Sequence, residues 1–220
     1  PGETLSASSI YDSNSYSIAS MIKEAGGIPD IIGIAKDEIS SIESNLRNAI
    51  DSDAIICSAG VSVGDKDFIK EVVSEQGKIN FWSVNIQPGK PFLYSHIQGR
   101  GKEIPFFGLP GNPVSVMVLM IKFVIPAIRK MQGDESVYPK QTKAILAEQI
   151  VNNSKRNMFA RVKVENINGE LIAKPFNNHD SHIISSFSES NALANIPENC
   201  KILKAGAEVD VEIFDNSNIL

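Results

Sequence analysis

The sequence predicts an α/β unit, with a mostly parallel sheet between two layers of helices, followed by a small all-β, barrel-like unit. Two observations favour this three-layer α/β/α fold and its β appendix. Over residues 10–131, short apolar segments typical of strands alternate with segments of helical periodicity. After Gly133 the helical periodicity stops, and strand-like segments follow up to residue 214. We therefore expect one domain at residues 1–135 and a second at residues 139–215.

The first half reads as alternating helices and strands. A helix over Tyr16–Ala25 has Asp12 or Ser13 as its cap and ends at Gly26-Gly27. Ser40 and Glu43 form a capping box for a second helix. Further helices are predicted at Phe68–Ser74 and at Val114–Met131, the latter kinked or interrupted near Pro126. Strands are predicted at Ile28–Ile34, Ala54–Cys57, Ile79–Ile86, Pro91–Ile97 and Ile104–Leu109.

The second half carries only strand signals. Asn168-Gly169 lies between two apolar segments and is typical of a tight hairpin turn. Further strands are predicted at Thr142–Ile150, Phe159–Val164, Glu170–Pro175 and Glu208–Phe214.

Composition excludes several classes of protein. The 220 residues include 21 Lys and Arg against 26 Asp and Glu, and the net charge of −5 argues against a nucleic-acid partner. The longest apolar stretch, Val114–Ile125, is too short to span a bilayer, so we expect no membrane partner. Cys57 and Cys200 form no disulfide framework, and we expect a cytoplasmic protein. Because the chain opens with Pro1 in a turn-like segment, we interpret it as a fragment without its N-terminal part.

Loops at the carboxyl ends of strands are where open α/β sheets bind ligands. In the loop before the first helix, Asp12, Ser13 and Asn14 either cap that helix or hold a ligand hydroxyl or a metal. The loop at residues 58–67 offers serines and glycines whose N–H groups suit an anion: Ser58, Gly60, Ser62 and Gly64. Asp65 and Asp67 are hard oxygen ligands that suit Mg²⁺, or favourable charges at a helix start.

Two proline-containing loops follow. Gln87–Pro91 is a stiff turn that presents the ammonium of Lys90, or it is a plain surface turn. At Leu109–Pro113, Gly111 and Asn112 either present N–H groups to an anion or cap the long helix.

A serine hydrolase is an alternative, because Gly60–Gly64 matches the G-x-S-x-G pattern of a nucleophile elbow. Such an enzyme needs a histidine base downstream. His96 is the only histidine of the α/β region and lies in a predicted strand, which disfavours this alternative.

Four motifs in order resemble the molybdopterin molybdenumtransferases, the MoeA and gephyrin E-domain family with its plant members. They are IYDSN at 10–14, SAGVSVGDKD at 58–67, QPGKP at 87–91 and GLPGNPVS at 108–115. The segments FARVKV (159–164) and SHIISSFSESNAL (181–193) also resemble that family's C-terminal region. The resemblance covers nearly the entire chain, without the family's N-terminal domains.

The resemblance implies an enzyme that inserts molybdate into adenylylated molybdopterin, releases AMP, uses Mg²⁺ and forms a homodimer. It implies that Asp12, Asp65 and Asp67 lie near the metal and that Lys90 is catalytic. Lys90, Arg161 and Ser181 would hold molybdate between the two domains. It implies further molybdopterin or phosphate contacts from Ser13, Asn14, Ser58, Gly60, Ser62, Gly64, Pro110, Gly111, Asn112 and Ser115.

This chain departs from the family pattern at three positions. Gln87 stands where the family commonly has Lys, Ala59 where Gly-Gly is usual, and Asp65 where Glu is frequent. Two alternatives remain open: a MogA-like molybdopterin adenylyltransferase, and a pterin-binding or scaffold module without turnover.

Overall fold

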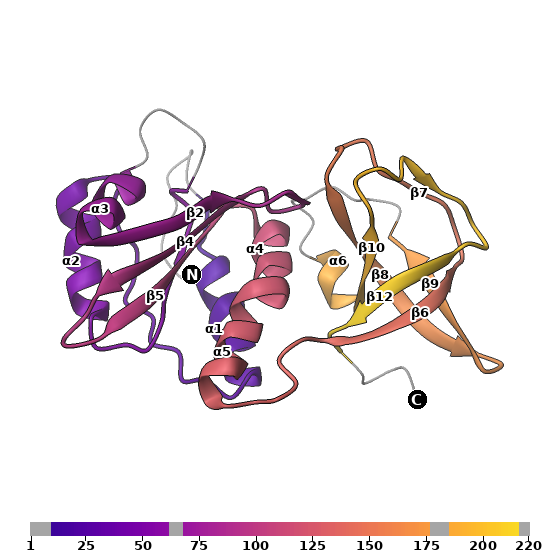
Figure 1. Cartoon of the computed structure of the whole chain (residues 1–220), viewed down its shortest axis with the longest axis horizontal. Helices are drawn as coiled ribbons and strands as arrows, with labels where there is room; N and C mark the ends of the chain where they lie inside the picture. Colours follow the sequence, from indigo (N-terminus) through magenta and orange to yellow (C-terminus); the bar gives the residue numbers. More distant parts are fainter. Residues whose placement is uncertain (1–9, 62–67, 177–184, 216–220) are drawn as a thin grey trace. The chain divides into compact units, whose positions relative to one another are not determined.

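The computed structural model describes residues 10–61, 68–176 and 185–215. The chain forms two compact units (Figure 1). The α/β unit comprises residues 1–83 and 91–135, and the barrel unit comprises residues 84–90 and 136–220. Residues 84–90, which we expected in the first domain, therefore belong to the second unit.

The α/β unit contains a four-stranded sheet in the order β1-β5-β4-β2. Its strands are β1 (Ile55–Ser58), β2 (Gly77–Ser83), β4 (Pro91–Gln98) and β5 (Glu103–Leu109). Its helices are α1 (Asn14–Glu24), α2 (Ile39–Ala49), α3 (Phe68–Gln76), α4 (Pro113–Leu119), the π-helix η1 (Met120–Val124) and α5 (Ile125–Gln132).

Helices cover both faces of this sheet, as predicted. On one face, Leu93 and Ile97 of β4 share a buried core with Leu46 of α2 and Val72 of α3. On the other face, the ring of Phe92 stacks on Phe107 of β5 and on Phe123 of η1, with centroids 6.4 and 5.0 Å apart. Alternation along the strands produces the two faces, because successive side chains point to opposite sides of a sheet.

The sheet is mixed rather than mostly parallel. In the part of the chain that the structure describes, β1 runs parallel to β5, while β5–β4 and β4–β2 are antiparallel. The reason is a tight turn between β4 and β5, where the N–H of Gly99 donates to the carbonyl of Lys102 at 2.8 Å. A turn this short joins only antiparallel strands.

Two local predictions in this unit are wrong. Ile28–Ile34 forms no strand and is largely exposed. Helix α2 starts at Ile39, so Ser40 lies inside it and no capping box forms; the hydroxyl of Ser41 instead accepts a bond from the Lys36 N–H at 3.0 Å. The interruption predicted near Pro126 is confirmed and lies in η1, because a proline inside a helix displaces the carbonyl four residues before it.

The barrel unit is a closed barrel of five strands in the order β10-β12-β6-β9-β8, with β8 pairing back to β10. These strands are β6 (Lys140–Leu146), β8 (Asn157–Ile167), β9 (Glu170–Pro175), β10 (Ala192–Ile196) and β12 (Glu208–Ile213). The unit also contains a separate two-stranded sheet of β7 (Ile150–Val151) and β11 (Ile202–Leu203), and the short helix α6 (Ser185–Ser188). The barrel-like expectation is confirmed, and Asn168-Gly169 makes the predicted hairpin turn with φ values of 54° and 91°.

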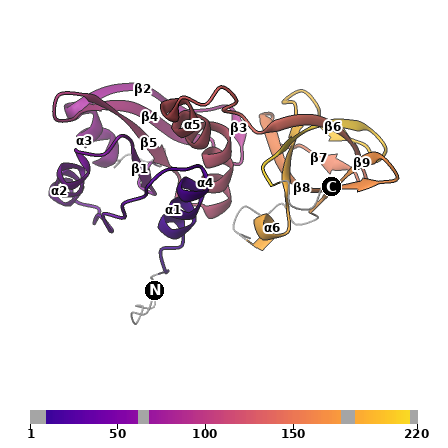
Figure 2. The ribbon, with the colours of Figure 1, turned by 90° about the horizontal axis from the view of Figure 1, so that it is seen from below.

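Strand β3 (Ile86–Gln87) explains why residues 84–90 belong to the barrel unit. It pairs in parallel with the start of β8, Gln87 opposite Met158 (Figure 2 labels both strands). The peptide bond from Gln87 to Pro88 is cis.

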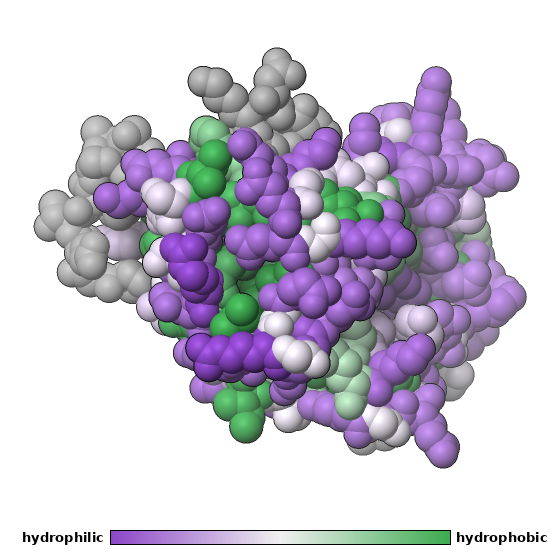
Figure 3. All heavy atoms as spheres, turned by 60° about the vertical axis from the view of Figure 1, so that its left-hand side comes forward, coloured by the Kyte–Doolittle hydropathy of each residue, from purple (hydrophilic) through white to green (hydrophobic). Residues whose placement is uncertain are grey.

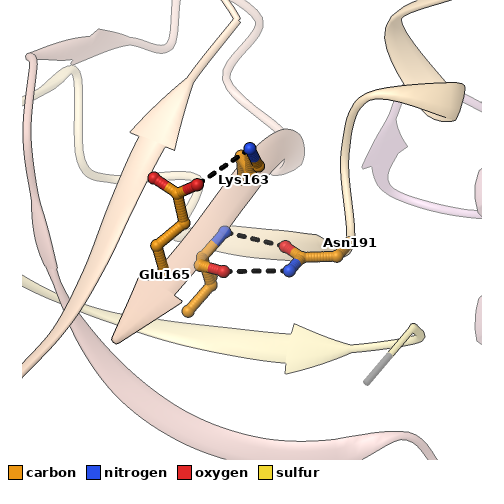
Figure 4. A network of polar contacts seen from close by, with 4 residues as sticks. Lys163, Glu165 and Asn191 are labelled. Carbon is orange, nitrogen blue, oxygen red and sulfur yellow. Dashed lines mark hydrogen bonds and ion pairs between the residues drawn. The ribbon is translucent and has the colours of Figure 1, made fainter. Parts of the chain in front are cut away.

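The side chain of Asn191, the residue before β10, binds the main chain of β8 (Figure 4). Its Oδ1 accepts a bond from the Val164 N–H at 2.7 Å, and its Nδ2 donates to the Val164 carbonyl at 2.9 Å. Beside it, the ammonium of Lys163 pairs with the carboxylate of Glu165 at 2.8 Å and lowers the pKa of that carboxyl, chiefly by a hydrogen bond. No helix in the described ranges is long and apolar enough to cross a bilayer.

Candidate functional site

Loops from three elements meet at the carboxyl ends of β1 and β5. The two strands are parallel, and Ser58 lies opposite Leu109, so their following loops begin side by side. The Ala59 N–H donates to the Leu109 carbonyl at 3.0 Å and ties the two loops together. The sequence predicted a ligand site at this edge.

Asn14, the first residue of α1, joins this pair of loops. Its Nδ2 donates to the hydroxyl of Ser58 at 2.8 Å and to the carbonyl of Gly111 at 3.0 Å. Because the Gly111 carbonyl only accepts, the orientation of the Asn14 amide follows from this contact. The carbonyl of Gly111 thus accepts from Asn14, and the prediction that Gly111 or Asn112 presents an N–H group to an anion stays a prediction. The Ser58 hydroxyl also lies 3.5 Å from the carbonyl of Pro110.

The side-chain oxygen of Asn14, Oδ1, is the atom that could accept a hydrogen bond from a ligand. This atom is buried and has no hydrogen-bond donor among the described residues. A buried acceptor without a donor costs about 1–3 kcal/mol. A ligand N–H or O–H placed here would remove that cost, so the site suits a ligand with a hydrogen-bond donor at this point.

Four of the predicted site residues lie at the N-terminal ends of helices. Oδ1 of Asp12 accepts from the Ser15 N–H at 3.1 Å, while Ser13 sits at the N-cap of α1 without a side-chain bond. Oδ1 of Asn112 accepts from the N–H and the hydroxyl of Ser115, at 3.1 and 3.3 Å. The capping interpretation therefore holds for Asp12 and Asn112.

The loop after β1 turns sharply at its start. Ala59 and Gly60 have φ values of 75° and 77°, in the left-handed region that favours glycine. Ser62, Gly64, Asp65 and Asp67 lie outside the described residues. Among the described residues there is no group of three His, Cys, Asp or Glu side chains that could hold a metal ion.

Two of the residues predicted to hold molybdate, Lys90 and Arg161, lie in described parts of the barrel unit. Arg161 of β8 is 3% exposed, with its guanidinium carbon 5.9 Å from the ring centre of Phe187. Lys90 is exposed and follows β3, where its carbonyl accepts from the Val84 N–H at 3.0 Å. Met158, the partner of Gln87 in β8, precedes Arg161 by three residues, or about 10 Å along the strand. Ser181 lies outside the described residues.

His96 does not serve the loop that contains the G-x-S-x-G pattern. Its Nε2 lies 3.2 Å from the hydroxyl of Tyr94 and its Nδ1 3.2 Å from Oδ1 of Asn80. His96 pairs with Pro105, four residues before Leu109, so it lies about 13 Å along the sheet from the end of β1. No histidine base stands beside that loop in the described part of the chain.

Two family models match the chain. Residues 2–130 match a model described as "Probable molybdopterin binding domain", and residues 143–214 match the "MoeA C-terminal region (domain IV)".

Two related proteins and one solved structure agree with these family matches. The chain is 31% identical to the molybdopterin molybdenumtransferase of Haemophilus influenzae, over 98% of this chain and 53% of that protein. It is 33% identical to the molybdenum cofactor synthesis protein cinnamon of Drosophila melanogaster, over 90% of this chain and 33% of that protein. A crystal structure of a molybdopterin biosynthesis moeA protein from a Pyrococcus species superposes with a TM-score of 0.81 at 29% identity, over 98% of this chain and 51% of that one. The chain thus spans about half the length of these bacterial and archaeal relatives.

Proposed function

The chain belongs to the molybdopterin-binding domain family and carries the MoeA C-terminal region, and from this premise we propose that it is part of a molybdenum insertase. The proposed reaction of the whole protein inserts molybdate into adenylylated molybdopterin and releases AMP. Relatives named molybdopterin molybdenumtransferase support a transferase in molybdenum cofactor biosynthesis.

The assignment of the ligand site rests on the buried Oδ1 of Asn14, which has no donor among the described residues. Molybdopterin and its adenylylated form bear N–H and O–H donors, and one of them would satisfy Asn14 Oδ1. Ser58 and Gly111 orient that acceptor through Nδ2. The loop positions at the ends of β1 and β5 suit a nucleotide-like ligand in an α/β sheet. We assign the remaining molybdopterin or phosphate contacts to Ser13, Gly60, Ser62, Gly64, Pro110, Asn112 and Ser115.

Molybdate is the proposed second substrate, held by Lys90, Arg161 and Ser181. A tetrahedral dianion takes charge-assisted hydrogen bonds from an ammonium and a guanidinium. That Lys90 and Arg161 belong to one unit supports their acting together. Gln87 places a neutral amide where the family commonly has a second ammonium, so we expect weaker binding of the dianion here.

Cleavage of the phosphoanhydride requires neutralisation of its negative charge, and Mg²⁺ supplies this when bound. Carboxylates are ligands that Mg²⁺ prefers, and we propose Asp12, Asp65 and Asp67. The described residues contribute only Asp12, whose Oδ1 already caps α1.

The proposal includes a homodimer in the cytoplasm, as expected from the family resemblance. Sedimentation equilibrium tests the assembly, since a chain that remains monomeric at micromolar concentration, alone and in the longer protein, would contradict the homodimer.

Calorimetric titration of this chain with molybdopterin and with its adenylylated form tests the ligand site. We expect the unmodified chain to bind. Asn14→Ala should bind at least about tenfold more weakly, because the ligand's N–H or O–H loses its acceptor, Oδ1 of Asn14. Asn48→Ala, an exposed asparagine of α2, is the matched control. Equal affinities of both variants would contradict the assignment. Release of AMP by the longer protein separates an insertase from a binding module.

A further inference from the structure

Strand β3 is held on the barrel unit by directed polar contacts. The N–H of Asn157, the first residue of β8, donates to the Asn85 carbonyl at 3.2 Å. Nη1 of Arg156 donates to the Ile86 carbonyl at 3.4 Å. Apolar side chains reach the surface of the α/β unit on the side shown in Figure 3. The contacts of β3 are of a different kind, because a hydrogen bond fixes direction as well as distance.

Glu198, in the loop after β10, adds a contact to the side chain of Asn85. Its Oε2 accepts from Nδ2 of Asn85 at 2.5 Å, and its own N–H donates to Oδ1 of Asn157 at 3.1 Å. Asn85 is therefore held on its main chain by β8 and on its side chain by Glu198. A carboxylate acceptor makes this bond stronger than one between two neutral groups.

Buried Asn152 joins the two loops that reach β3. Asn152 is 4% exposed, and its Nδ2 donates to the Arg156 carbonyl at 2.8 Å and to the Pro197 carbonyl at 3.4 Å. Its N–H donates to the Lys201 carbonyl at 2.8 Å. The loop that contains Arg156 and the loop that contains Glu198 are thus fixed to each other by one buried side chain.

A main-chain bond carries this hold to Lys90. The N–H of Val84 donates to the Lys90 carbonyl at 3.0 Å, and Val84 directly precedes Asn85. A shift of Asn85 therefore shifts the main chain of Lys90. Asn85 and Glu198 are both exposed, where water competes for their polar groups, so their bond acts on position more than on stability.

We propose that Glu198 is a positioning residue of the molybdate site, and that its bond to Asn85 fixes the main chain from which Lys90 presents its ammonium. This inference rests on the proposed function, which assigns Lys90 to molybdate. A lysine on a fixed main chain loses less freedom when it binds an anion, so its contact contributes more to affinity. Lys90 and Arg161 belong to the same unit, and Glu198 holds Lys90 to that unit.

Amide hydrogen exchange of this chain tests the hold on Lys90 without a ligand. The Val84 amide is the reporter, because its acceptor is the Lys90 carbonyl. In Glu198→Ala we expect this amide to exchange at least about threefold faster. Glu198→Gln keeps a side-chain acceptor and should keep most of the protection. Glu170→Ala, at an exposed glutamate of the same unit, is the control and should keep all of it. Equal exchange in Glu198→Ala and the unmodified chain would overturn the proposal.

Molybdate-dependent release of AMP by the longer protein tests the role in the site. Glu198→Ala should raise the KM for molybdate about three- to tenfold and leave the KM for adenylylated molybdopterin unchanged, a split that general loss of folding does not produce. Glu198→Gln should restore most of the molybdate affinity. Because Glu198 acts through Lys90, Glu198→Ala should add no further increase in a Lys90→Ala background. An increase of the same size in that background would overturn the proposal.

The two measurements separate this inference from the proposed function. If Lys90→Ala leaves the KM for molybdate unchanged, the proposed molybdate site is overturned and the positioning role with it, whatever the exchange of the Val84 amide. If Lys90→Ala raises that KM and Glu198→Ala does not, the molybdate site stands and the positioning role of Glu198 is overturned.

Discussion

Nδ2 of Asn14 donates to the hydroxyl of Ser58 at 2.8 Å, and this bond joins the first residue of α1 to the last residue of β1 across 44 positions of sequence. The same Nδ2 reaches the Gly111 carbonyl, so both loops beside the strand ends are held by one side chain. An amide in this position couples the start of a helix to the sheet edge at which we propose that the ligand binds.

The left-handed conformation of Ala59 gives a prediction on stability. Its φ of 75° costs an L residue about 1 kcal/mol, which glycine avoids. Ala59→Gly should therefore raise the free energy of unfolding by about 0.5–1 kcal/mol in urea denaturation. Ala49→Gly, at the buried last residue of helix α2, should instead lower it by about 0.5–1 kcal/mol. A loss of stability in Ala59→Gly would contradict the conformation described.

Asn191 is predicted to be essential for the barrel unit. It is 4% exposed and satisfies both main-chain groups of Val164. Asn191→Ala leaves a buried N–H and a buried C=O unpaired and should lower the free energy of unfolding by about 2–4 kcal/mol. Asn153→Ala, at an exposed loop position, should change it by less than about 0.5 kcal/mol. Similar urea midpoints for the two variants would refute the role of Asn191.

Lys163 lowers the pKa of Glu165, first through a hydrogen bond and then through its charge. Lys163→Met should return the pKa of Glu165 towards its ordinary value, as followed by NMR titration of the side-chain carboxyl. Lys174→Met should raise it less, because Lys174 acts only through a weaker charge interaction.

The sign of the pH effect follows from this shift. A carboxyl whose pKa is lower in the folded state stabilises the fold above its unfolded pKa, and this contribution disappears as the pH falls through the folded value. The side chains of Lys163 and Glu165 are both more than 40% exposed, so the effect of their ion pair on stability is small and screened by salt. An unchanged Glu165 titration in Lys163→Met would show that the ion pair does not form in solution.

The affinity of the longer protein for molybdate tests whether Lys90 and Arg161 bind this anion. Lys90→Ala should weaken it about tenfold or more, since one charge-assisted hydrogen bond is removed. Arg161→Lys keeps the charge but removes the planar fork, and should weaken binding by a similar factor. Lys204→Ala, at an exposed position of the same unit, is the control. Unchanged molybdate affinity in both site variants would exclude this location.

Asp65 tests the proposed metal site. Asp65→Asn should raise the Mg²⁺ concentration that half-activates AMP release by about tenfold, because an amide oxygen is a weaker ligand than a carboxylate. The measurement uses the longer protein, and Asp134→Asn, an exposed residue, is the control. An unaltered Mg²⁺ dependence would remove Asp65 from the metal site.

Much of the fold could be predicted from apolar periodicity, and the failures have local causes. The helices of the α/β unit and the β1, β4 and β5 strands followed from the spacing of apolar residues, most clearly in α2, which buries Ile42, Leu46 and Ala49, and in β4. Strand β10 was missed because Ala192–Ile196 contains alanines and an asparagine, which have low strand propensity. Its place in the barrel comes from pairing with β8 and β12, a tertiary contact that local sequence does not encode.

The candidate site could be predicted only as a meeting of loops. Strand-end position identified the loops that contain Asn14, Ser58 and Gly111. The atoms in contact could not be predicted, because the orientation of the Asn14 amide depends on a carbonyl 97 positions away. Likewise, the assignment of Lys90 to the barrel unit depends on the two-residue pairing of β3 with β8, which is too short to leave a sequence pattern.

Strand β3 has a consequence for how this protein can be divided or recombined. A gene fragment encoding residues 136–220 alone lacks Val84–Lys90 and leaves Asn157 and Met158 of β8 without their neighbour. A chimera that exchanges only the C-terminal segment between relatives would pair a foreign β8 with the resident β3. Transplanting the barrel as an intact module therefore requires two separate pieces of coding sequence, and one of them lies inside the α/β half.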